Sequence, residues 1–497
     1  MNEQQLNDDP FEGVMPPPPP PPLNEGQQWA HDRTVAYVTN QGPNIPKIIL
    51  IRGFAGTGKT FTTNRIVKTL QEYCAKNRQR LDIAASAPTH KAVRCLRKAG
   101  DLGSGVTYAT IHSLLGLRPE PEEKSGKQIF QKSTNPDDGK IGEYNVLILD
   151  EISQLGAALW QELMEAMEEH GFKLILLGDE VQIPPVKEKD SLPFLEAELY
   201  GIEDTALTQS MRQAGDNPIL DYATEIRNTY QTSTWIDYKQ YARVNEKGEG
   251  LEVFQGTNTK AIKELLEDKF GSDYFRADPD YMKVVAWTNK TVNIFNNQIR
   301  RMLYPIPEGM LGLPMIVHGE KLIMNDRYVA AGEFKPIVIP NNEELEVEKY
   351  EVVKKAVTYK LWSPLGYVEK HLNPQIYKTL VRFRGINNNW IKATLNIVHE
   401  TSTTQVQAMM NEISDSAKKA PFGLERRNMW KHFWEIHGLF AQIGYNYALT
   451  AHKAQGSTYE NCVMIAYDIK QNPRTEERNR IAYVAGTRAK KMLYIIE

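Results

Sequence analysis

The sequence predicts an α/β protein with two parallel-sheet domains, the second of which is interrupted by an insertion. From about residue 25 to residue 205, short apolar runs alternate with helical stretches, which is the pattern of a parallel sheet covered by helices. A second such pattern begins near LTQSMRQ (207–213) and resumes after a long gap at about residue 444. The loop GFAGTGKT (53–60) stands between a strand-like run and a helical stretch, the context that a phosphate-binding loop requires.

Length and composition narrow the class of protein. A chain of 497 residues is too long for one hydrophobic core and predicts two to four domains. It is 41% hydrophobic and 24% charged, and no apolar run approaches the roughly 18 residues of a membrane span, so we expect a soluble protein without a membrane partner. The net charge of −3 gives no general attraction to phosphate backbones. Any nucleic-acid site must therefore be a local groove.

Cysteine usage and the N-terminus indicate the compartment. The 3 cysteines, Cys74, Cys95 and Cys462, lie far apart without a CxxC pair, which suggests neither a disulfide framework nor a zinc site. The first residues lack the basic-then-apolar design of a secretory signal. We therefore expect a cytoplasmic protein.

The first 205 residues divide into a tail and a domain. Residues 1–24 are polar and contain the proline run Pro16–Pro22, which predicts a disordered tail, with a docking peptide for a partner as the alternative. Residues 25–205 form the first sheet domain. Within it, the polar stretch 117–143 breaks the alternation and is rich in turn formers. It is either a passive loop or a working protrusion.

The second domain is assigned to residues 206–303 and 444–497, and the insertion to residues 304–443. β-rich runs such as YEVVKKAVTYKLW and QIYKTLVRFRG predict a β module in the insertion, followed by the helical stretch MWKHFWEIHGLFAQ. The helical stretch carries aromatic residues spaced by three and four, which favours a core-facing side over a nucleic-acid platform. These residues are Trp430, Phe433, Trp434 and Phe440.

The residues of GFAGTGKT are those that phosphate binding needs. Gly53, Gly58, Lys59 and Thr60 satisfy GxxxxGK[ST]. Backbone N–H groups of the loop, including Gly56 and Thr57, would wrap the phosphates of ATP. Lys59 would neutralise the β- and γ-phosphate oxygens, and the Thr60 hydroxyl would ligate Mg²⁺.

Two later strands end in polar residues suited to the same chemistry. VLILDEIS places Asp150 and Glu151 at a strand end, where Asp150 suits Mg²⁺ and Glu151 suits polarising an attacking water. LILLGDEVQIPPV offers Gln182, an uncharged group that can hydrogen-bond a γ-phosphate. The structural alternatives are a solvated acidic turn and a buried amide.

Further motifs follow in a fixed order: SAPTHKAV (86–93), YATIHSLLG (108–116), VVAWTNKTVNIFN (284–296), ALTAHKAQGSTY (448–459) and YVAGTRAKK (483–491). Together with the segments above, this series resembles superfamily 1B DNA helicases of the RecD/Dda type, and the LNEGQ opening is similar to that of Dda-like phage helicases. The likeness is weakest in the insertion. It implies two RecA-like motor domains, a small pin in the first, and an SH3-like β module in the second whose helical extension clamps the pin.

The resemblance also implies roles around ATP. Gln27 in LNEGQ takes the place that reads the adenine edge, although Gln28 beside it could serve instead. Arg212 and Arg488 match two arginines that reach the γ-phosphate from the second motor domain. Gln455 and Gly456 match positions that link the ATP site to the DNA side.

For DNA, the resemblance implies a set of polar residues along a single-strand path: Thr89, His90, Thr110, His112, Asn289, Thr450 and His452. Such groups bind phosphate and sugar without reading sequence, although each alone could equally be a cap, a turn or a core residue. Phe130 falls where the family has an apolar residue on the strand-separating pin, where an aromatic ring at a hairpin tip could stack on the last base pair and stop the second strand from following. The alternative for Phe130 is a ring folded back on its own domain.

The function implied by the resemblance is that of a monomeric, ATP- and Mg²⁺-dependent DNA helicase moving 5′→3′. Its partners would be single-stranded DNA, forked duplex and a single-strand-binding or replisome protein, and its setting phage-type replication or recombination in a host cytoplasm. A translocase that displaces bound proteins with little unwinding has the same motor. A nucleotide-dependent switch or small-molecule kinase, and RNA as the substrate, are further alternatives.

Overall fold

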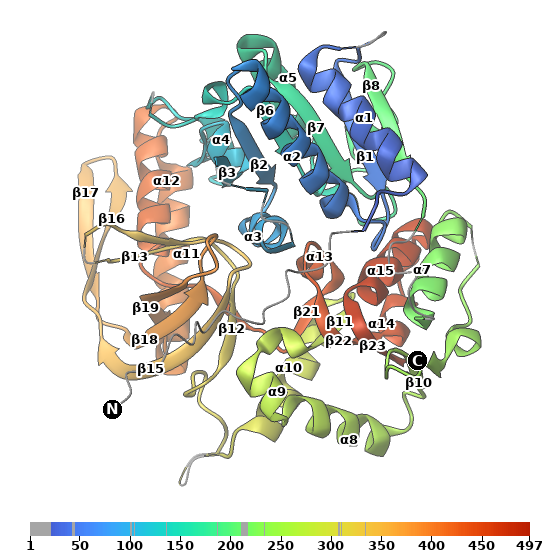
Figure 1. The fold of residues 1–497 in the computed structure, drawn as a ribbon. Helices are drawn as coiled ribbons and strands as arrows, with labels where there is room; N and C mark the ends of the chain where they lie inside the picture. Colours follow the sequence, from blue (N-terminus) through green and yellow to red (C-terminus); the bar gives the residue numbers. More distant parts are fainter. Residues whose placement is uncertain are drawn as a thin grey trace, which may run out of the picture.

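The computed structural model describes residues 21–41, 45–99, 102–103, 105–135, 137–185, 187–209, 217–232, 234–306, 309, 311–332 and 334–497. The tail assigned to residues 1–24 therefore falls largely outside the described residues. The structure confirms the α/β fold class, with two covered, mainly parallel sheets and an inserted β-rich part (Figure 1). None of the helices in the described ranges is both long and apolar enough to cross a lipid bilayer.

The first sheet is parallel throughout and has the strand order β3-β2-β6-β7-β1-β8. Successive strand residues point to opposite faces, so Ile48 and Leu50 join one buried cluster and Ile49 and Ile51 the other. Both faces are covered, as parallel sheets require. The strands are β1 (Ile48–Gly53), β2 (Ile83–Ala87), β3 (Val106–Thr110), β6 (Val146–Leu149), β7 (Lys173–Gly178) and β8 (Ile202–Leu207).

Helices α1 (Glu25–Thr39), α2 (Lys59–Asn77) and α3 (His90–Ala99) pack on one face of this sheet. The other face is covered by α4 (Ile111–Leu114) and α5 (Ala157–His170). A hairpin of β4 (Leu117–Pro121) and β5 (Gln128–Lys132) rises from the α4 side. We call it the pin, after the role that the resemblance implies for it.

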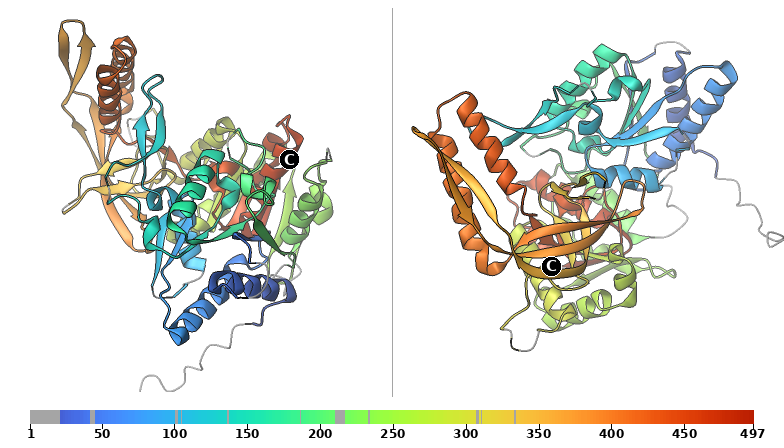
Figure 2. Two further views of the ribbon diagram at one scale, coloured as in Figure 1. Left: turned by 90° about the horizontal axis from the view of Figure 1, so that it is seen from above. Right: turned by 90° about the vertical axis from the view of Figure 1, so that its left-hand side faces the viewer.

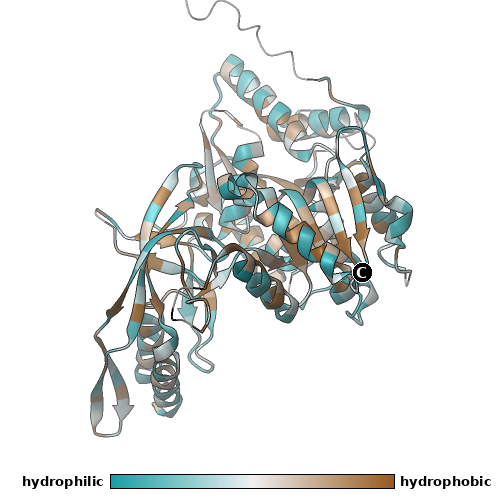
Figure 3. Ribbon diagram, turned by 90° about the horizontal axis from the view of Figure 1, so that it is seen from below, coloured by the Kyte–Doolittle hydropathy of each residue, from teal (hydrophilic) through white to brown (hydrophobic). Residues whose placement is uncertain are grey.

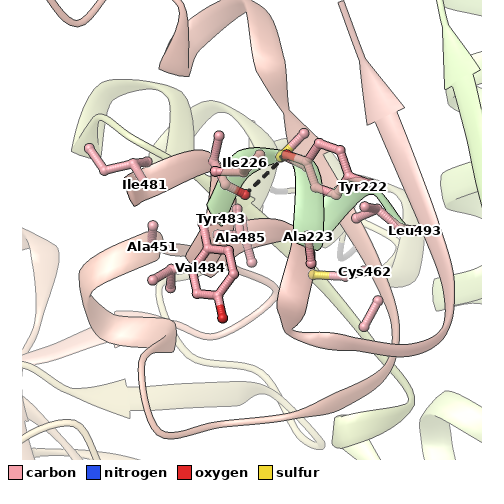
Figure 4. Close-up of a cluster of buried hydrophobic side chains, with 14 of the residues drawn as sticks. Tyr222, Ala223, Ile226, Ala451, Cys462, Ile481, Tyr483, Val484, Ala485 and Leu493 are labelled. Atoms are coloured by element: carbon pink, nitrogen blue, oxygen red, sulfur yellow. Dashed lines mark hydrogen bonds between the residues drawn. The ribbon is translucent and has the colours of Figure 1, made fainter. Parts of the chain in front are cut away.

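The second sheet has the order β21-β11-β22-β23-β10-β9, in which only β9, at the edge, runs antiparallel to its neighbour. Its strands are β9 (Arg243–Val244), β10 (Gly250–Phe254), β11 (Met282–Ala286), β21 (Ala448–Thr450), β22 (Tyr459–Ile465) and β23 (Ala489–Ile496). One face packs against α7, α13, α14 and α15, and the other against α8, α9 and α10. These helices are α7 (Pro218–Thr229), α8 (Thr259–Phe270), α9 (Asp273–Ala277), α10 (Asn289–Leu303), α13 (Ala451–Ala454), α14 (Ala466–Ile469) and α15 (Thr475–Thr487). Figure 4 shows the α7–α15 side of this core.

The insertion contains an antiparallel sheet of order β19-β18-β15-β12-β20. Its strands and the two nearby hairpins are β12 (Lys321–Met324), β13 (Tyr328–Ala330), β14 (Ile337–Ile339), β15 (Glu344–Lys354), β16 (Val357–Ser363), β17 (Gly366–Leu372), β18 (Gln375–Arg384), β19 (Trp390–Val398) and β20 (Ile443–Tyr445). The β16–β17 hairpin and helices α11 (Thr403–Lys419) and α12 (Leu424–His437) share a core and project from the body as an arm (Figure 2). The hydropathy colouring shows apolar residues along the strands and mostly polar residues on the outer helices (Figure 3). The SH3-like assignment of the module stays a prediction.

Two strands correct the sequence-based domain limits. β8 pairs with β1 and ends at Leu207, so residues 206 and 207 belong to the first sheet. β20 pairs with β12, so residues 444 and 445 belong to the inserted sheet. Hydrogen-bond partners across a sheet, which local sequence does not specify, set both limits. The remaining short helices are η1 (Ile141–Glu143), η2 (Ile152–Gln154), α6 (Leu192–Leu195), η3 (Tyr238–Tyr241), η4 (Pro279–Tyr281) and η5 (Glu400–Ser402).

Candidate functional site

The loop between β1 and α2 has the shape of a phosphate cradle. Gly56 and Gly58 have φ angles of 87° and 82°, which favour glycine. A Cβ atom on Gly53 would lie 2.5 Å from the Thr57 hydroxyl oxygen, so the loop can close this tightly only around a glycine. α2 begins at Lys59, and the positive end of its dipole therefore faces the loop.

Lys59 and Gln27 are both bonded to this loop. The Lys59 ammonium donates to the backbone oxygens of Gly53 at 2.5 Å and Phe54 at 3.3 Å, and phosphate oxygens could replace these acceptors. Gln27 is fully buried; its Nε2 donates to the Thr57 carbonyl at 3.1 Å and its Oε1 accepts from the Asn24 N–H. Gln28 is exposed and donates to Asp32. Of the two glutamines, Gln27 is the one at the loop.

Three carboxylates lie beyond the ends of neighbouring strands. Asp150 and Glu151 follow β6, and Asp179, which the sequence reasoning missed, follows β7. Burial raises the pKa of Asp150 and of Asp179, and the Lys59 charge opposes both increases. Burial, and then the Asp150 charge, raise the pKa of Glu151 to about 7, against the lowering effect of Arg488 and Lys59. The GDE triplet after an apolar strand was the available signal for Asp179.

A cavity of about 810 Å³ joins the predicted ATP-site residues of both domains. Its lining includes Gly56, Lys59, Thr60, Asp150, Glu151, Gln182, Gly456 and Arg488. Arg488 is buried and is held by its own domain, since its Nη1 donates to the Ser457 carbonyl at 2.9 Å and its Nε to the Val484 carbonyl at 3.0 Å. A Cβ atom on Gly456 would lie 3.4 Å from the Ala92 Cβ across the domain boundary. Arg212 lies outside the described residues.

The donor set fits MgATP. The described residues contain no group of three histidine, cysteine or acidic side chains able to hold a metal by themselves. A Mg²⁺ ion that keeps waters and binds substrate phosphates needs only one or two protein ligands, and Thr60 and Asp150 are the residues here that would hold it. When bound, Mg²⁺ would neutralise phosphate charge.

The predicted DNA-contact residues gather at helix N-termini. Thr89, Thr110 and Thr450 each accept a backbone N–H in the first turn of α3, α4 and α13. Asn289, which is exposed, opens α10 after the capping residue Thr288. A capping threonine accepts with its oxygen and can still donate its O–H, while the helix dipole favours an anion at that end. The capping role and phosphate contact are therefore compatible.

The structure brings His90, His112 and Phe130 together. The His112 and Phe130 rings lie 4.4 Å apart, and His112 contributes to the depressed pKa of His90. Burial is the main cause that lowers the pKa of His90 to about 4, followed by the charges of Arg94 and Arg327. His90 is thus neutral at physiological pH and offers hydrogen bonds without charge.

The second-domain residues form a separate group near the insertion. Burial lowers the pKa of His452, which follows Thr450 on α13. The next residue, Lys453, donates to Asn325 at 2.8 Å in the turn that also carries Arg327. Sequence reasoning missed Asn325 and Arg327, which border both groups, because they come from the insertion where the motif likeness is weakest.

The position of Phe130 corrects one expectation. The sequence interpretation placed this aromatic ring at a hairpin tip, but Phe130 pairs with Pro119 in the middle of β5. It is 57% exposed, beside His112. The tip consists of residues 122–127, because the strands end there.

The pin tip is bound by the arm. Trp430 Nε1 donates to the Glu123 carbonyl at 3.0 Å, and Trp434 Nε1 donates to the Gly126 carbonyl at 2.9 Å. The Gly423 N–H also donates to the Glu123 carboxylate. Trp430 and Phe440 are buried in the arm, and Phe433 packs against the same cluster, as expected for a core-facing side. Trp434 differs from this expectation, because it is half-buried against the tip. These bonds join the tip to α12 and to the residue before it.

Comparison with known proteins shows consistent likenesses. A family model described as an AAA domain matches residues 23–249, and one described as a UvrD-like helicase C-terminal domain matches residues 445–496. The ATP-dependent DNA helicase Dda of Enterobacteria phage T4 is 25% identical over 489 residues, which cover 95% of this chain and 99% of Dda. The RecBCD enzyme subunit RecD of Buchnera aphidicola is 25% identical over 478 residues, covering 91% of this chain and 70% of RecD. The crystal structure of Pif1 helicase from Candida albicans has the same fold, with a TM-score of 0.50 and 16% identity over 96% of this chain and 95% of that one.

Proposed function

The chain belongs to the RecD/Dda/Pif1-like helicases of superfamily 1B and is a helicase ATPase, and on that premise we propose that it moves 5′→3′ on single-stranded DNA and unwinds duplex DNA. The observation that carries the proposal is the shared cavity, in which Lys59 and Glu151 of one domain meet Arg488 of the other. ATP is then bound by groups from both sheets, so that binding favours closure of the domains.

In this proposal each residue has a defined task. Lys59 and the loop N–H groups bind the phosphates, and Glu151 accepts a proton from the attacking water. Arg488 stabilises charge that develops on the transferring phosphate. Gln182 hydrogen-bonds the γ-phosphate, Gln27 reads the base, and Thr60 and Asp150 hold the metal.

The DNA strand would follow the helix N-termini of both domains. Two sets of residues, one from each domain, would bind phosphate and sugar alternately as the domains close and open. The first domain contributes Thr89, His90 and Thr110, and the second contributes Asn289, Thr450 and His452. The Asn325–Arg327 turn borders both groups and supports a path that passes between them. The protein would work in the cytoplasm as a monomer, in phage-type replication or recombination, beside a single-strand-binding or replisome protein.

Strand displacement tests both the direction and the activity. Two duplexes of the same sequence, one with a single-stranded 5′ tail and one with a 3′ tail, are offered with MgATP, and Lys59→Ala is the inactive control. We expect opening of the 5′-tailed duplex alone. Opening from the 3′ tail would reverse the proposed direction, and DNA-stimulated ATP hydrolysis without opening of either would favour the translocase. If DNA did not change the rate of ATP hydrolysis, the proposed motor function would be contradicted.

Phe130→Ala is expected to reduce unwinding while leaving DNA-stimulated ATP hydrolysis close to that of the native protein. The exposed ring beside His112 can stack on the last base pair, and such stacking contributes about 1–3 kcal/mol per base. The measurement is the ratio of base pairs opened to ATP hydrolysed. Ile129→Ala, an exposed neighbour in the same strand, is the matched control. If Phe130→Ala lowered unwinding and DNA-stimulated ATP hydrolysis equally, the proposed role of Phe130 in strand separation would be wrong.

A further inference from the structure

The segment after β7, residues 179–183, leaves the first sheet but packs in the second domain; we call it the Gln182 loop. Val181 and Ile183 are buried in the cluster formed by α7 and α15, whose members include Tyr222 and Ile481 (Figure 4). The loop is continuous with a strand of one domain, while its apolar side chains belong to the core of the other.

Three side chains of the second domain also bind the polar groups of this loop. The Tyr483 hydroxyl donates to Asp179 Oδ2 at 2.7 Å, and Gln455 Nε2 donates to the Ile183 carbonyl at 2.8 Å. Arg480 Nη1 donates to the carbonyls of Glu180 at 2.6 Å and Gln182 at 3.0 Å. Each of these bonds crosses the domain boundary.

Arg480 makes the most extensive of these contacts. Its side chain is 3% exposed, and its Nη2 also donates to Asp190 of the first domain at 2.6 Å and to Glu476 of its own helix at 2.9 Å. The planar guanidinium holds its donors in a fixed fork, so two carbonyls and a carboxylate of the first domain are set relative to α15.

Arg480 bonds the backbone carbonyl of Gln182, which leaves the side-chain amide available to a ligand. Its side chain is buried and lines the cavity, while its Oε1 has no hydrogen-bond partner among the residues that the structure describes. A buried acceptor oxygen without a partner is costly unless a donor such as a water O–H satisfies it, and the Nε2 of the same amide is the group that can donate to a phosphate oxygen. The backbone at Gln182 is fixed by Arg480, and the side chain faces the nucleotide cavity.

We propose that Arg480 is a positioning residue for ATP hydrolysis, which sets the Gln182 loop so that the Gln182 amide moves with the second domain toward the terminal phosphate. This inference rests on the proposed function. Gln182 lies between two elements of the first domain but is then carried by the second domain. The helix that holds it, α15, ends at Thr487 and is capped by Arg488.

The contact of Tyr483 with the phosphate-binding loop supports this coupling. Its hydroxyl accepts from the Ala55 N–H at 3.3 Å while donating to Asp179. In Figure 4 the hydroxyl points away from the apolar cluster that holds the ring. α15 thus touches both the loop that carries Gln182 and the loop that carries Lys59.

The test separates positioning from folding by steady-state kinetics on the full chain with saturating single-stranded DNA. We expect Arg480→Met to lower kcat for ATP by up to about 10²-fold, the cost of a misplacement near 1 Å, with KM little changed. Arg480→Lys, which keeps the charge but not the fork, should recover part of the loss. In a Gln182→Ala background, Arg480→Met should lower kcat little further.

Arg300→Met is the matched control. Arg300 is also a buried helix arginine that donates to two carbonyls, of Pro314 and Met315, and to one carboxylate, of Glu320. It lies at the insertion, so its loss should lower thermal stability without a comparable fall in kcat. Equal kcat losses in the two variants would overturn the proposal, as would full additivity of Arg480→Met with Gln182→Ala.

Two further measurements cover the cases in which the Arg480→Met variant or the native protein is inactive for another reason. If Arg480→Met does not fold, Asp190→Asn replaces it, because Asp190 is a first-domain partner of the same guanidinium. We expect a smaller loss of kcat from Asp190→Asn. This loss should again vanish in the Gln182→Ala background. No such loss would contradict the proposal. If the native protein itself shows no DNA-stimulated ATP hydrolysis, the proposed function fails first, which distinguishes that failure from a failure of the positioning role.

Discussion

Glu151→Gln is expected to stop ATP turnover while leaving ATP binding intact. The amide has the size of the carboxylate but cannot accept a proton from water, and loss of a general base costs about 10²- to 10⁴-fold in rate. Glu151 lines the cavity together with Lys59 and Arg488, as the proposed general base requires. Hydrolysis is measured as released phosphate, and binding by titration with a non-hydrolysable analogue.

The matched variant for this experiment is Glu188→Gln. Glu188 is an acceptor for the Ala157 N–H and has no contact with the nucleotide cavity. We expect native-like turnover from it. If Glu151→Gln keeps turnover within a few-fold of native, another group must accept the proton, and the assignment of Glu151 would be wrong.

The pH dependence of kcat/KM follows from the same residue. Burial and the Asp150 charge raise the Glu151 pKa to about 7 in the nucleotide-free protein, and only the ionised carboxylate can act as a base. kcat/KM, which reports groups of the free enzyme, should therefore fall as the pH drops below 7 and level off above it. A profile that is flat from pH 6 to pH 8 would contradict the role.

Arg488→Met is expected to lower kcat by about 10³- to 10⁵-fold, the range found for arginines that reach a transferring phosphoryl group. Arg488 already lines the cavity, and its guanidinium is held by bonds to Ser457 and Val484, so we expect little reorganisation when the domains close. Arg488→Lys should recover only part of the rate, because a point charge does not reproduce the fork.

A second readout distinguishes an electrostatic role of Arg488 from a structural one. The Arg488 charge lowers the Glu151 pKa, so its removal should move the midpoint of the kcat/KM profile to higher pH. Arg474→Met, an exposed arginine at the start of the same helix, should change neither kcat nor the midpoint. A large loss of rate with an unmoved midpoint would indicate that Arg488 only supports the fold around Ser457.

Local sequence was sufficient for the nucleotide loop and for the strands that end in it. The turn of the loop requires glycine at positions 56 and 58, and Lys59 follows directly in the same motif. The apolar runs before Gly53, Asp150 and Asp179 predict buried strands by themselves. Motif order was sufficient to predict that Arg488 and Lys59 belong to one site, and both residues line the same cavity. In each case a short stretch contains both the structural signal and the chemical group.

What only the tertiary structure decided are the relations between segments distant in sequence. Three of these relations depend on which surfaces meet. They are the sheet partner of β8, the position of Phe130 in the middle of its strand, and the binding of the pin tip by Trp430. So does the anchoring of Gln182 by Arg480, since their bond joins residues 298 positions apart. Periodicity and turn chemistry are properties of neighbouring residues, whereas such bonds arise when separate cores dock. For that reason the sequence by itself determined which chemical groups this site contains, and the packing of the two domains decided which of them are held together.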